Sequence, residues 1–112
     1  MPDSIPIRVA RGVKYLDDHK PEWRRLISAE DLDMASCRRC VLGQLFESFN
    51  SIKAGLFLCS AHDSYDHFCR MAESHGLEAD KSDTDGMMEN YDELTAEWRK
   101  HLANPEYILE VP

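Results

Sequence analysis

Hydrophobic residues recur at helical spacing in the first part of the chain. The first stripe consists of Ile5, Val9, Val13 and Leu16. Residues three and four apart lie on one face of a helix, so this stripe predicts an amphipathic helix. Ser4 is a favourable N-cap and Pro6 is tolerated in a first turn, so we expect the helix to cover 4–18. Pro21 interrupts the pattern, and PEWRRLI at 21–27 predicts a short second helix.

The strongest apolar stripe follows in the middle of the chain. Its members are Val41, Leu42, Leu45, Phe46 and Phe49. Their spacing predicts a buried helix over about 38–50. We interpret the next apolar segment, AGLFL at 54–58, as a loop or a short strand.

Another helical pattern begins after this segment. Ser60 and Asp63 resemble a capping box at its start, and Gly76 supplies a stop signal at its end. The stripe between them consists of Ala61, Tyr65, Phe68, Cys69 and Ala72. We therefore expect a helix between these two signals, with this stripe facing the core.

The segment EADKSDTDGMMENYDE at 78–93 differs from the rest, because it holds seven acidic residues against one lysine. It has little apolar periodicity, and we expect a solvated acidic loop at about 78–89. A last helix opens at Asn90 and ends at Pro105, and 106–112 is expected to form a short strand or an extended arm. The stripe of this helix is Tyr91, Leu94, Thr95, Trp98 and Leu102.

Together these patterns predict a mainly α protein, a small single domain over 1–112 built as a bundle of four to five helices. The length of 112 residues suits one domain and leaves no room for two. The apolar fraction of 43%, with two Trp, four Phe and four Tyr, is enough for a modest core.

The net charge of −8 narrows the range of partners. Residues 1–40 carry eight basic and seven acidic side chains, whereas 41–112 carry five basic and fourteen acidic ones. An acidic balance argues against nucleic acid as a partner, because attraction to phosphate requires excess positive charge. We interpret Arg24 and Arg25, beside Trp23, as part of a solvated helix face.

The N-terminal stretch has no signal-peptide pattern, and no apolar run approaches the roughly 18 residues that a membrane span requires. We therefore expect a cytoplasmic protein with no membrane partner. In that compartment the four cysteines are expected to be reduced or metal-bound, and not to form a disulfide framework.

Four residues have the spacing of a short zinc site. They are Cys37, Cys40, Cys59 and His62, written C-x2-C-x18-C-x2-H. Zinc prefers four such ligands in a tetrahedron, and a two-residue gap lets two side chains bind one ion from a tight turn. The alternative is a set of buried or half-buried thiols. Cys40 leads straight into an apolar helix, and Cys69 lies on a core stripe, as a small hydrophobic residue would.

Catalytic motifs are lacking, since the chain has no nucleophile elbow, phosphate loop or metalloprotease motif. The sequence therefore predicts a protein that is not an enzyme. A hydrolase or redox enzyme that uses Cys40 or Cys59 is the remaining catalytic alternative, because a cysteine with a histidine in reach can act as a nucleophile. A calcium loop is disfavoured, because Lys81 stands where its first carboxylate belongs.

Three stretches carry a resemblance to a protein family. They are RGVKYLDDHKPEWRRLISAEDLDMASCRRCVLGQLFESF, ESHGLEAD and YDELTAEWRKHL. The chain resembles small proteins of actinobacteria and mycobacteriophages, most specifically in its CVLGQLF helix and its closing LTxxW helix. Leu77 departs from that pattern, in which an aromatic residue is more usual. The resemblance implies a setting, a mycobacteriophage or an actinobacterial cytosol, and no biochemical activity. It has Cys40 as the recurrent cysteine and does not imply a family-wide zinc site.

These observations favour a small acidic interaction module, not an enzyme, that is phage-encoded and binds a host or phage protein in the host cytosol. An acidic loop suits a basic partner surface. The predicted partner-binding residues are Asp80, Asp83, Asp85 and Glu89. Such a module needs no cofactor. The alternative is a zinc-stabilised small domain with a binding or regulatory role, in which the four predicted zinc ligands hold the ion.

Overall fold

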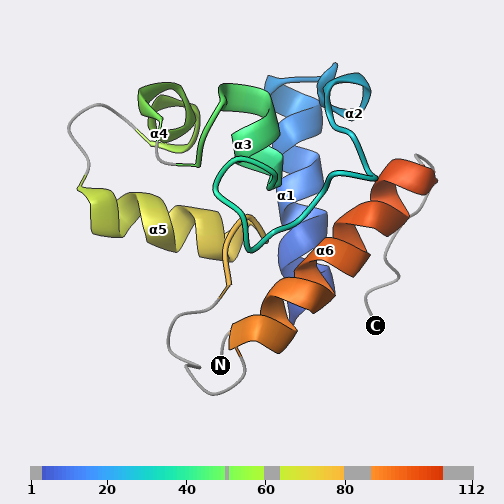
Figure 1. Ribbon diagram of the computed structural model, residues 1–112. Helices are drawn as coiled ribbons and strands as arrows, with labels where there is room; N and C mark the ends of the chain where they lie inside the picture. The colour runs from blue at the N-terminus through green and yellow to red at the C-terminus, as the bar shows by residue number, and fades with distance from the viewer. Residues whose placement is uncertain (1–3, 50, 60–63, 80–86, 105–112) are drawn as a thin grey trace.

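The computed structural model describes residues 4–49, 51–59, 64–79 and 87–104, and all regular structure within these ranges is helical (Figure 1). The six helices are α1 Ile5–His19, α2 Trp23–Leu26, α3 Val41–Phe46, α4 Ile52–Leu58, α5 Tyr65–Ser74 and α6 Met87–Ala103. The predicted mainly α, small single-domain fold is confirmed. The described residues hold six helices, where four to five were expected, because the middle of the chain divides into short segments.

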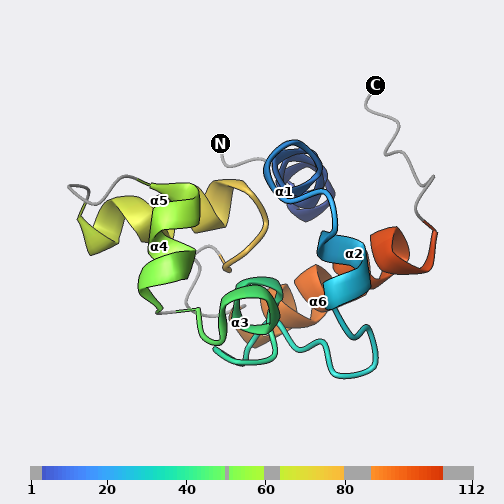
Figure 2. The same ribbon diagram turned by 90° about the horizontal axis from the view of Figure 1, so that it is seen from above.

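Helix α1 organises the fold. Its contact with α6 is the most extensive between any two helices, and it also packs against α5. Helix α3 packs against α4 and α2, and α4 packs against α5. Figure 2 shows α1 nearly end-on, with α4 and α5 to one side of it and α2 to the other. The predicted first helix, 4–18, is confirmed by α1, because its stripe faces these neighbours and is buried.

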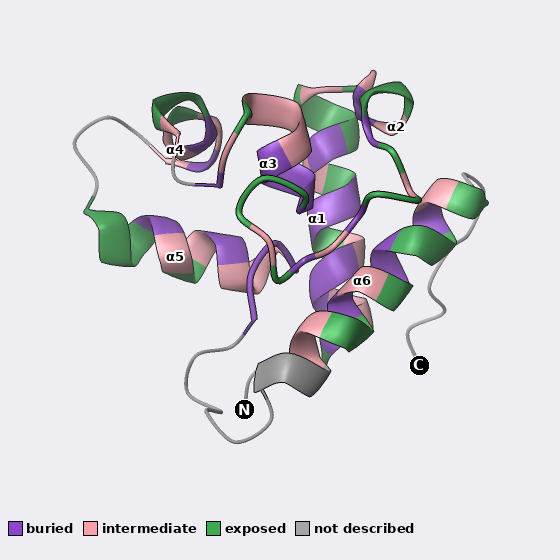
Figure 3. Ribbon diagram, in the orientation of Figure 1, coloured by how far each residue is buried: buried purple, intermediate pink, exposed green. Residues whose placement is uncertain are grey.

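Two tryptophans form the centre of the core. Trp23 and Trp98 are both fully buried, and their rings meet edge to face with centroids 5.6 Å apart. Each indole also has a hydrogen-bond acceptor, because Trp98 Nε1 donates to the Gly76 carbonyl at 2.6 Å and Trp23 Nε1 donates to Asp17 Oδ1 at 2.9 Å. Large buried rings with satisfied N–H groups stabilise a small core strongly. Figure 3 shows the buried faces of α1 and α6 turned toward each other.

Glycine lets α1 and the turn after α5 approach each other closely. A Cβ on Gly12 would lie 2.0 Å from the His75 carbonyl oxygen. Gly76 has φ +67°, the left-handed region that ends helices, and a Cβ there would lie 2.7 Å from the backbone of Val9. The predicted stop at Gly76 is therefore confirmed, and the same residue also allows the close packing.

Arginines of α1 cap the C-terminal end of α5. Arg8 Nη1 donates to the Glu73 carbonyl at 3.3 Å, and Arg11 Nη1 donates to the Ser74 carbonyl at 2.7 Å. The last carbonyls of a helix lack intrahelical partners and carry partial negative charge, so cations stabilise this end. These bonds hold the C-terminal end of α5 against α1.

The predicted loop or strand at 54–58 is wrong, because this segment belongs to α4. The Ser51 side chain caps the helix by accepting a hydrogen bond from the Ala54 amide at 3.1 Å. Ala54 and Leu58, four residues apart, are the buried face of α4. A short apolar run does not distinguish a helix from a strand, and packing against α3 and α5 decides between them here.

The buried helix predicted over 38–50 is shorter than expected. Helix α3 is capped by Cys40 and ends where Glu47 adopts φ 75°, a conformation that a helix cannot continue through. Val41, Leu42 and Phe49 are buried as predicted. Leu45 and Phe46 pack against the core from half-buried positions.

The helix expected after Ser60 begins later than predicted. Its N-cap is Ser64, whose hydroxyl accepts from the His67 amide at 3.2 Å. Phe68 and Ala72 form its buried face, as expected, but Tyr65 is 58% exposed. The predicted capping-box residues 60–63 lie outside the described residues.

The solvated loop expected at about 78–89 is wrong at both ends. Glu78 and Ala79 are buried, and α6 already begins at Met87. Residues 80–86 lie outside the described residues, as does the predicted C-terminal arm at 106–112. Leu94 and Trp98 of the predicted last stripe are buried in the core, and Tyr91 and Leu102 pack against it.

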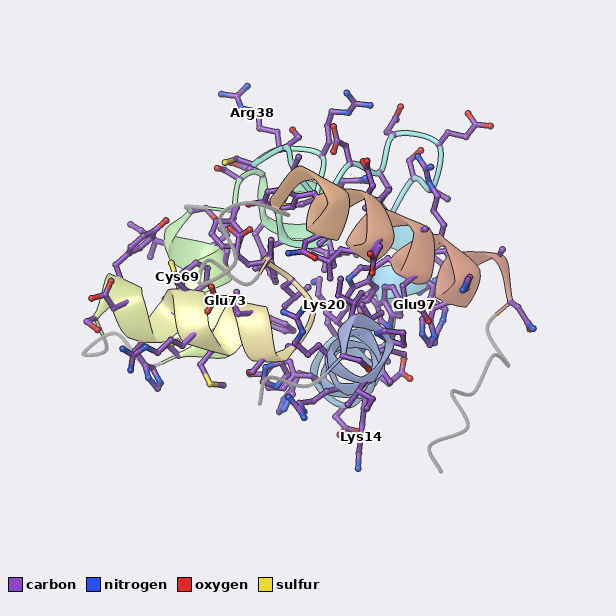
Figure 4. The ribbon with its side chains drawn as sticks, turned by 90° about the horizontal axis from the view of Figure 1, so that it is seen from below. Lys14, Lys20, Arg38, Cys69, Glu73 and Glu97 are labelled. Carbon is purple, nitrogen blue, oxygen red and sulfur yellow. The ribbon has the colours of Figure 1, made fainter. Side chains whose placement is uncertain are left out.

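Helix α6 also buries two titratable side chains. Glu97 and His101 are 5% and 3% exposed, and Glu97 Oε2 lies 3.7 Å from His101 Nε2. Burial lowers the pKa of His101, and the nearby Glu97 carboxylate opposes this only in part. Figure 4 shows Glu97 on the side of α6 that faces α1.

We expect this pair to make stability depend on pH. An unfolded histidine titrates near pH 6.5, so below this pH the unfolded chain binds a proton that folded His101 binds only at lower pH. The free energy of unfolding should therefore fall as the pH drops from about 7.5 to about 5.5. Urea unfolding at both values should show a smaller fall in His101→Asn. The control is His67→Asn at an exposed position, which should lose as much stability as wild type over this pH range. An equal fall in the free energy of unfolding in wild type and His101→Asn would contradict the prediction.

Candidate functional site

A small cavity of about 50 Å³ lies between the turn before α3, the segment after α5 and the start of α6. We call it the thiol pocket. Its lining includes Cys37, Cys40, Phe49, Leu77, Glu78 and Tyr91. Two cysteines, a glutamate and a tyrosine thus line one cavity, although they come from three separate segments of the chain.

The turn that carries both cysteines is held in place by hydrogen bonds. The Cys40 amide donates to the Ser36 carbonyl at 3.0 Å, and the Phe49 amide donates to the Cys37 carbonyl at 2.7 Å. Gly43 of α3 lies directly against this turn, because a Cβ on it would be 2.3 Å from the Cys37 oxygen. Residues 36–40 therefore form one fixed turn packed on the first turn of α3.

The two thiols of this turn have different environments. Cys40 is 1% exposed and caps α3, since its Sγ accepts from the Gly43 amide at 3.3 Å. Burial raises the pKa of the Cys40 thiol to about 11, so it stays protonated at neutral pH. Cys37 is exposed. The expectation of buried or half-buried thiols is therefore confirmed for Cys40 and wrong for Cys37.

Glu78 and Tyr91 close the other side of the pocket. Glu78 is 9% exposed, and its Oε1 accepts from Tyr91 Oη at 2.5 Å and from the Ala79 amide at 2.8 Å. Burial raises the pKa of Tyr91, and the Glu78 carboxylate raises it further. Sequence reasoning missed Glu78 by assigning it to a solvated loop. Its apolar neighbours Leu77 and Ala79, both buried, are the signal that could have placed it inside.

The structure brings together only part of the predicted zinc site. Cys37 and Cys40 line the thiol pocket, whereas Cys59 is the C-cap of α4 and does not line that pocket. His62 lies outside the described residues. Among the residues that the structure describes, no three His, Cys, Asp or Glu side chains are grouped so that they could hold a metal ion. Zinc binding stays a prediction.

Helix α4 presents an apolar surface. Ile52 is 82% exposed and Leu56 is 53% exposed, and their spacing of four residues places them on one face. We call these two residues the α4 surface. Figure 3 shows this side of α4 turned away from the rest of the fold. Scattered single hydrophobic residues are normal on surfaces, whereas here two large aliphatic side chains lie four residues apart on one helix face.

The predicted partner-binding acids are not part of this surface. Asp80, Asp83 and Asp85 lie outside the described residues. Glu89 belongs to the first turn of α6, and its side chain lies outside the described residues. Their role stays a prediction, and the α4 surface is a second candidate that sequence patterning missed because it did not identify α4 as a helix.

Comparison with known proteins assigns this chain to no protein family, so only its fold describes its class. No family model, no curated protein and no solved structure matches the chain. The resemblance to actinobacterial and mycobacteriophage proteins therefore stays a prediction. None of the helices in the described ranges has the length and apolar character that crossing a membrane requires. What the structure defines is a small helical domain with a thiol pocket and an apolar α4 surface.

Proposed function

We propose that this protein is a small non-enzymatic interaction module, phage-encoded, that binds another protein through the α4 surface. The observation that carries the proposal is the 82% exposure of Ile52, next to a half-exposed Leu56 on the same helix face. Leaving large aliphatic side chains in water is unfavourable, and a partner that covers them gains roughly 1.5–3 kcal/mol for each.

The α4 surface is also rigid enough to bind without a large entropic cost. Ser51 caps the helix, and Ala54 and Leu58 anchor its opposite face in the core. A helix held in its binding conformation loses little freedom when a partner covers it. The arrangement suits a partner with an apolar groove that accepts one face of a short helix.

The charge of the chain adds a preference for basic partners. The net charge of −8 favours a protein with a basic surface around its apolar groove. The predicted partner-binding acids and the α4 surface are two separate candidates for contact with this partner. This partner is a host or phage protein in our proposal, and neither a cofactor nor nucleic acid is needed.

Substitution on α4 tests the proposal. The wild-type protein and the double variant Ile52→Ser/Leu56→Ser are immobilised and exposed to an actinobacterial lysate, and bound proteins are quantified by mass spectrometry. We expect at least one protein to be retained by wild type and reduced tenfold or more by the variant, because losing about 1.4 kcal/mol of binding energy already lowers affinity tenfold.

Leu26→Ser is the matched control, because Leu26 is 50% exposed but lies on α2. It should retain the same protein as wild type. Circular dichroism establishes that all three proteins fold. The proposal requires a protein that binds wild type and Leu26→Ser but not the double variant. If the experiment finds no protein with this pattern, binding through the α4 surface is wrong.

The alternative function is a zinc-stabilised domain. The observation that favours it is that Cys37 and Cys40 line one pocket from a single fixed turn, as a pair of zinc ligands would. It requires two further ligands, for which Cys59 and His62 are the predicted residues. Elemental analysis of the purified protein distinguishes this alternative, and it forms part of the experiment below.

A further inference from the structure

We propose that Cys37 and Cys40 are a redox-active dithiol that is oxidised to an intramolecular disulfide by exchange with a low-molecular-weight disulfide. This inference concerns the thiol pocket and is independent of binding through the α4 surface. It rests on the geometry of the turn, on the difference in exposure between the two thiols, and on their shared cavity.

The turn brings the two cysteines within reach of each other. The hydrogen bond from the Cys40 amide to the Ser36 carbonyl closes one helical turn, and Ser36 Oγ accepts from the Arg39 amide at 3.2 Å within it. Residues three apart in such a turn have Cα atoms less than about 7 Å apart. A disulfide usually requires about 4.4–6.8 Å, so the backbone need not rearrange to form one.

The Cys40 side chain points back toward Cys37 within this turn. Cys40 Sγ lies 3.8 Å from the Cys37 carbonyl oxygen, and both residues line the thiol pocket. We expect rotation about the side-chain bonds of the exposed Cys37 to bring the two sulfur atoms together. Figure 4 shows Arg38, which stands between the two cysteines, pointing away from the helices, so the turn is at the surface.

Exposure assigns the two thiols different roles. Cys37 is exposed, and its thiolate can attack a small disulfide, form a mixed disulfide and release one thiolate of the reagent. Cys40 is buried, so the reagent does not reach it directly and it reacts second. It loses its proton as its sulfur attacks Cys37 Sγ, and the remaining half of the reagent leaves as a second thiol. One disulfide of the reagent is thereby reduced to two thiols, and the two protein thiols are oxidised.

The carboxylate that lines the same cavity is already engaged by other groups. Glu78 Oε1 accepts hydrogen bonds from Tyr91 Oη and from the Ala79 amide. The proton that Cys40 releases therefore leaves with the second thiol of the reagent. Cys37 and Cys40 are the residues that react.

Tryptic mapping after equilibration with glutathione disulfide tests the proposal. Trypsin cleaves after Arg38 and Arg39, so the two cysteines fall on separate peptides, 26–38 and 40–53. We expect these two peptides to be joined in the oxidised protein and to separate on reduction. Cys59 and Cys69 share a third peptide, 54–70, so their oxidation cannot produce the same product.

Single variants separate the two steps. Cys37→Ser should abolish the joined product, and Cys40→Ser should leave glutathione attached to Cys37, because the attacking thiol of the second step is missing. Serine is itself a good N-cap, so Cys40→Ser should still fold. Cys59→Ser is the control and should leave the joined product unchanged.

Three results would overturn the proposal. The first is wild-type protein that carries glutathione on Cys37 without joining 26–38 to 40–53. The second is wild-type protein in which both cysteines remain open to alkylation after oxidation. The third is one zinc per chain by elemental analysis, with the joined product absent until a chelator removes the metal, which would establish the zinc-stabilised alternative instead.

Discussion

Replacement of Gly12 by alanine should destabilise the protein by about 3 kcal/mol or more. The added Cβ would lie 2.0 Å from the His75 carbonyl oxygen and 3.0 Å from Cζ2 of the buried Trp98. A backbone oxygen cannot move as a flexible side chain can, so α1 would have to separate from the turn after α5. Urea unfolding of wild type and Gly12→Ala measures the loss.

Gly55→Ala is the matched control, because Gly55 also lies in a helix but a Cβ there would meet no atom within 4 Å. Alanine is favoured over glycine in helices by about 0.5–1 kcal/mol, so this variant should be as stable as wild type or more stable. Equal stability of the two variants would mean that α1 and the turn after α5 do not approach as closely as described.

Replacement of Trp98 by alanine should cost about 3–5 kcal/mol. The side chain is fully buried, meets Trp23 edge to face, and donates a hydrogen bond to the Gly76 carbonyl. Truncation removes these contacts and leaves a cavity at the crossing of α1 and α6, and it also leaves the Gly76 oxygen without its indole donor. In a domain of this size such a loss is a large fraction of the expected stability of roughly 5–15 kcal/mol.

Leu45→Ala provides the comparison for Trp98→Ala. The apolar stripe alone predicts a similar cost for Leu45, Phe46 and Trp98, at about 2–5 kcal/mol each. Because Leu45 is half-buried, its truncation should cost less than that of Trp98. Urea unfolding of both variants checks this order, and a greater loss in Leu45→Ala would contradict the burial described for these two residues.

Positions 12 and 98 are in contact, so the losses of stability in Gly12→Ala and Trp98→Ala should not add. A Cβ on Gly12 would touch the Trp98 ring, and removal of that ring makes room for it. Residues that share a contact typically show coupling in double-mutant cycles. Gly12→Ala should therefore cost less in a Trp98→Ala background than in wild type.

Long helices with clear periodicity could be predicted from the sequence. The stripe that begins at Ile5 and the stop at Gly76 both depend on local spacing and local backbone preference, and the structure confirms both. The same holds for Leu94 and Trp98, whose burial follows from their place on one face of α6. In these cases the residues that decide the structure are neighbours in the chain.

Short segments could not be predicted in the same way. The run AGLFL is apolar throughout and has no period, so nothing local indicates that Leu58 is buried and Leu56 exposed. That difference exists because α3 and α5 cover one face of α4 and leave the other open. The α4 surface is thus a consequence of packing between segments that are distant in the sequence.

The thiol pocket depends both on local spacing in the sequence and on packing between distant segments. The two-residue gap between Cys37 and Cys40 indicated that they act as a pair, because a tight turn places such residues together. The sequence by itself thus determined the long helices, the stop at Gly76 and this pair, all through interactions a few residues apart. Only the tertiary structure decided that Glu78 is buried against Tyr91 beside the pair and that Ile52 is exposed, because burial depends on which distant segments cover a residue.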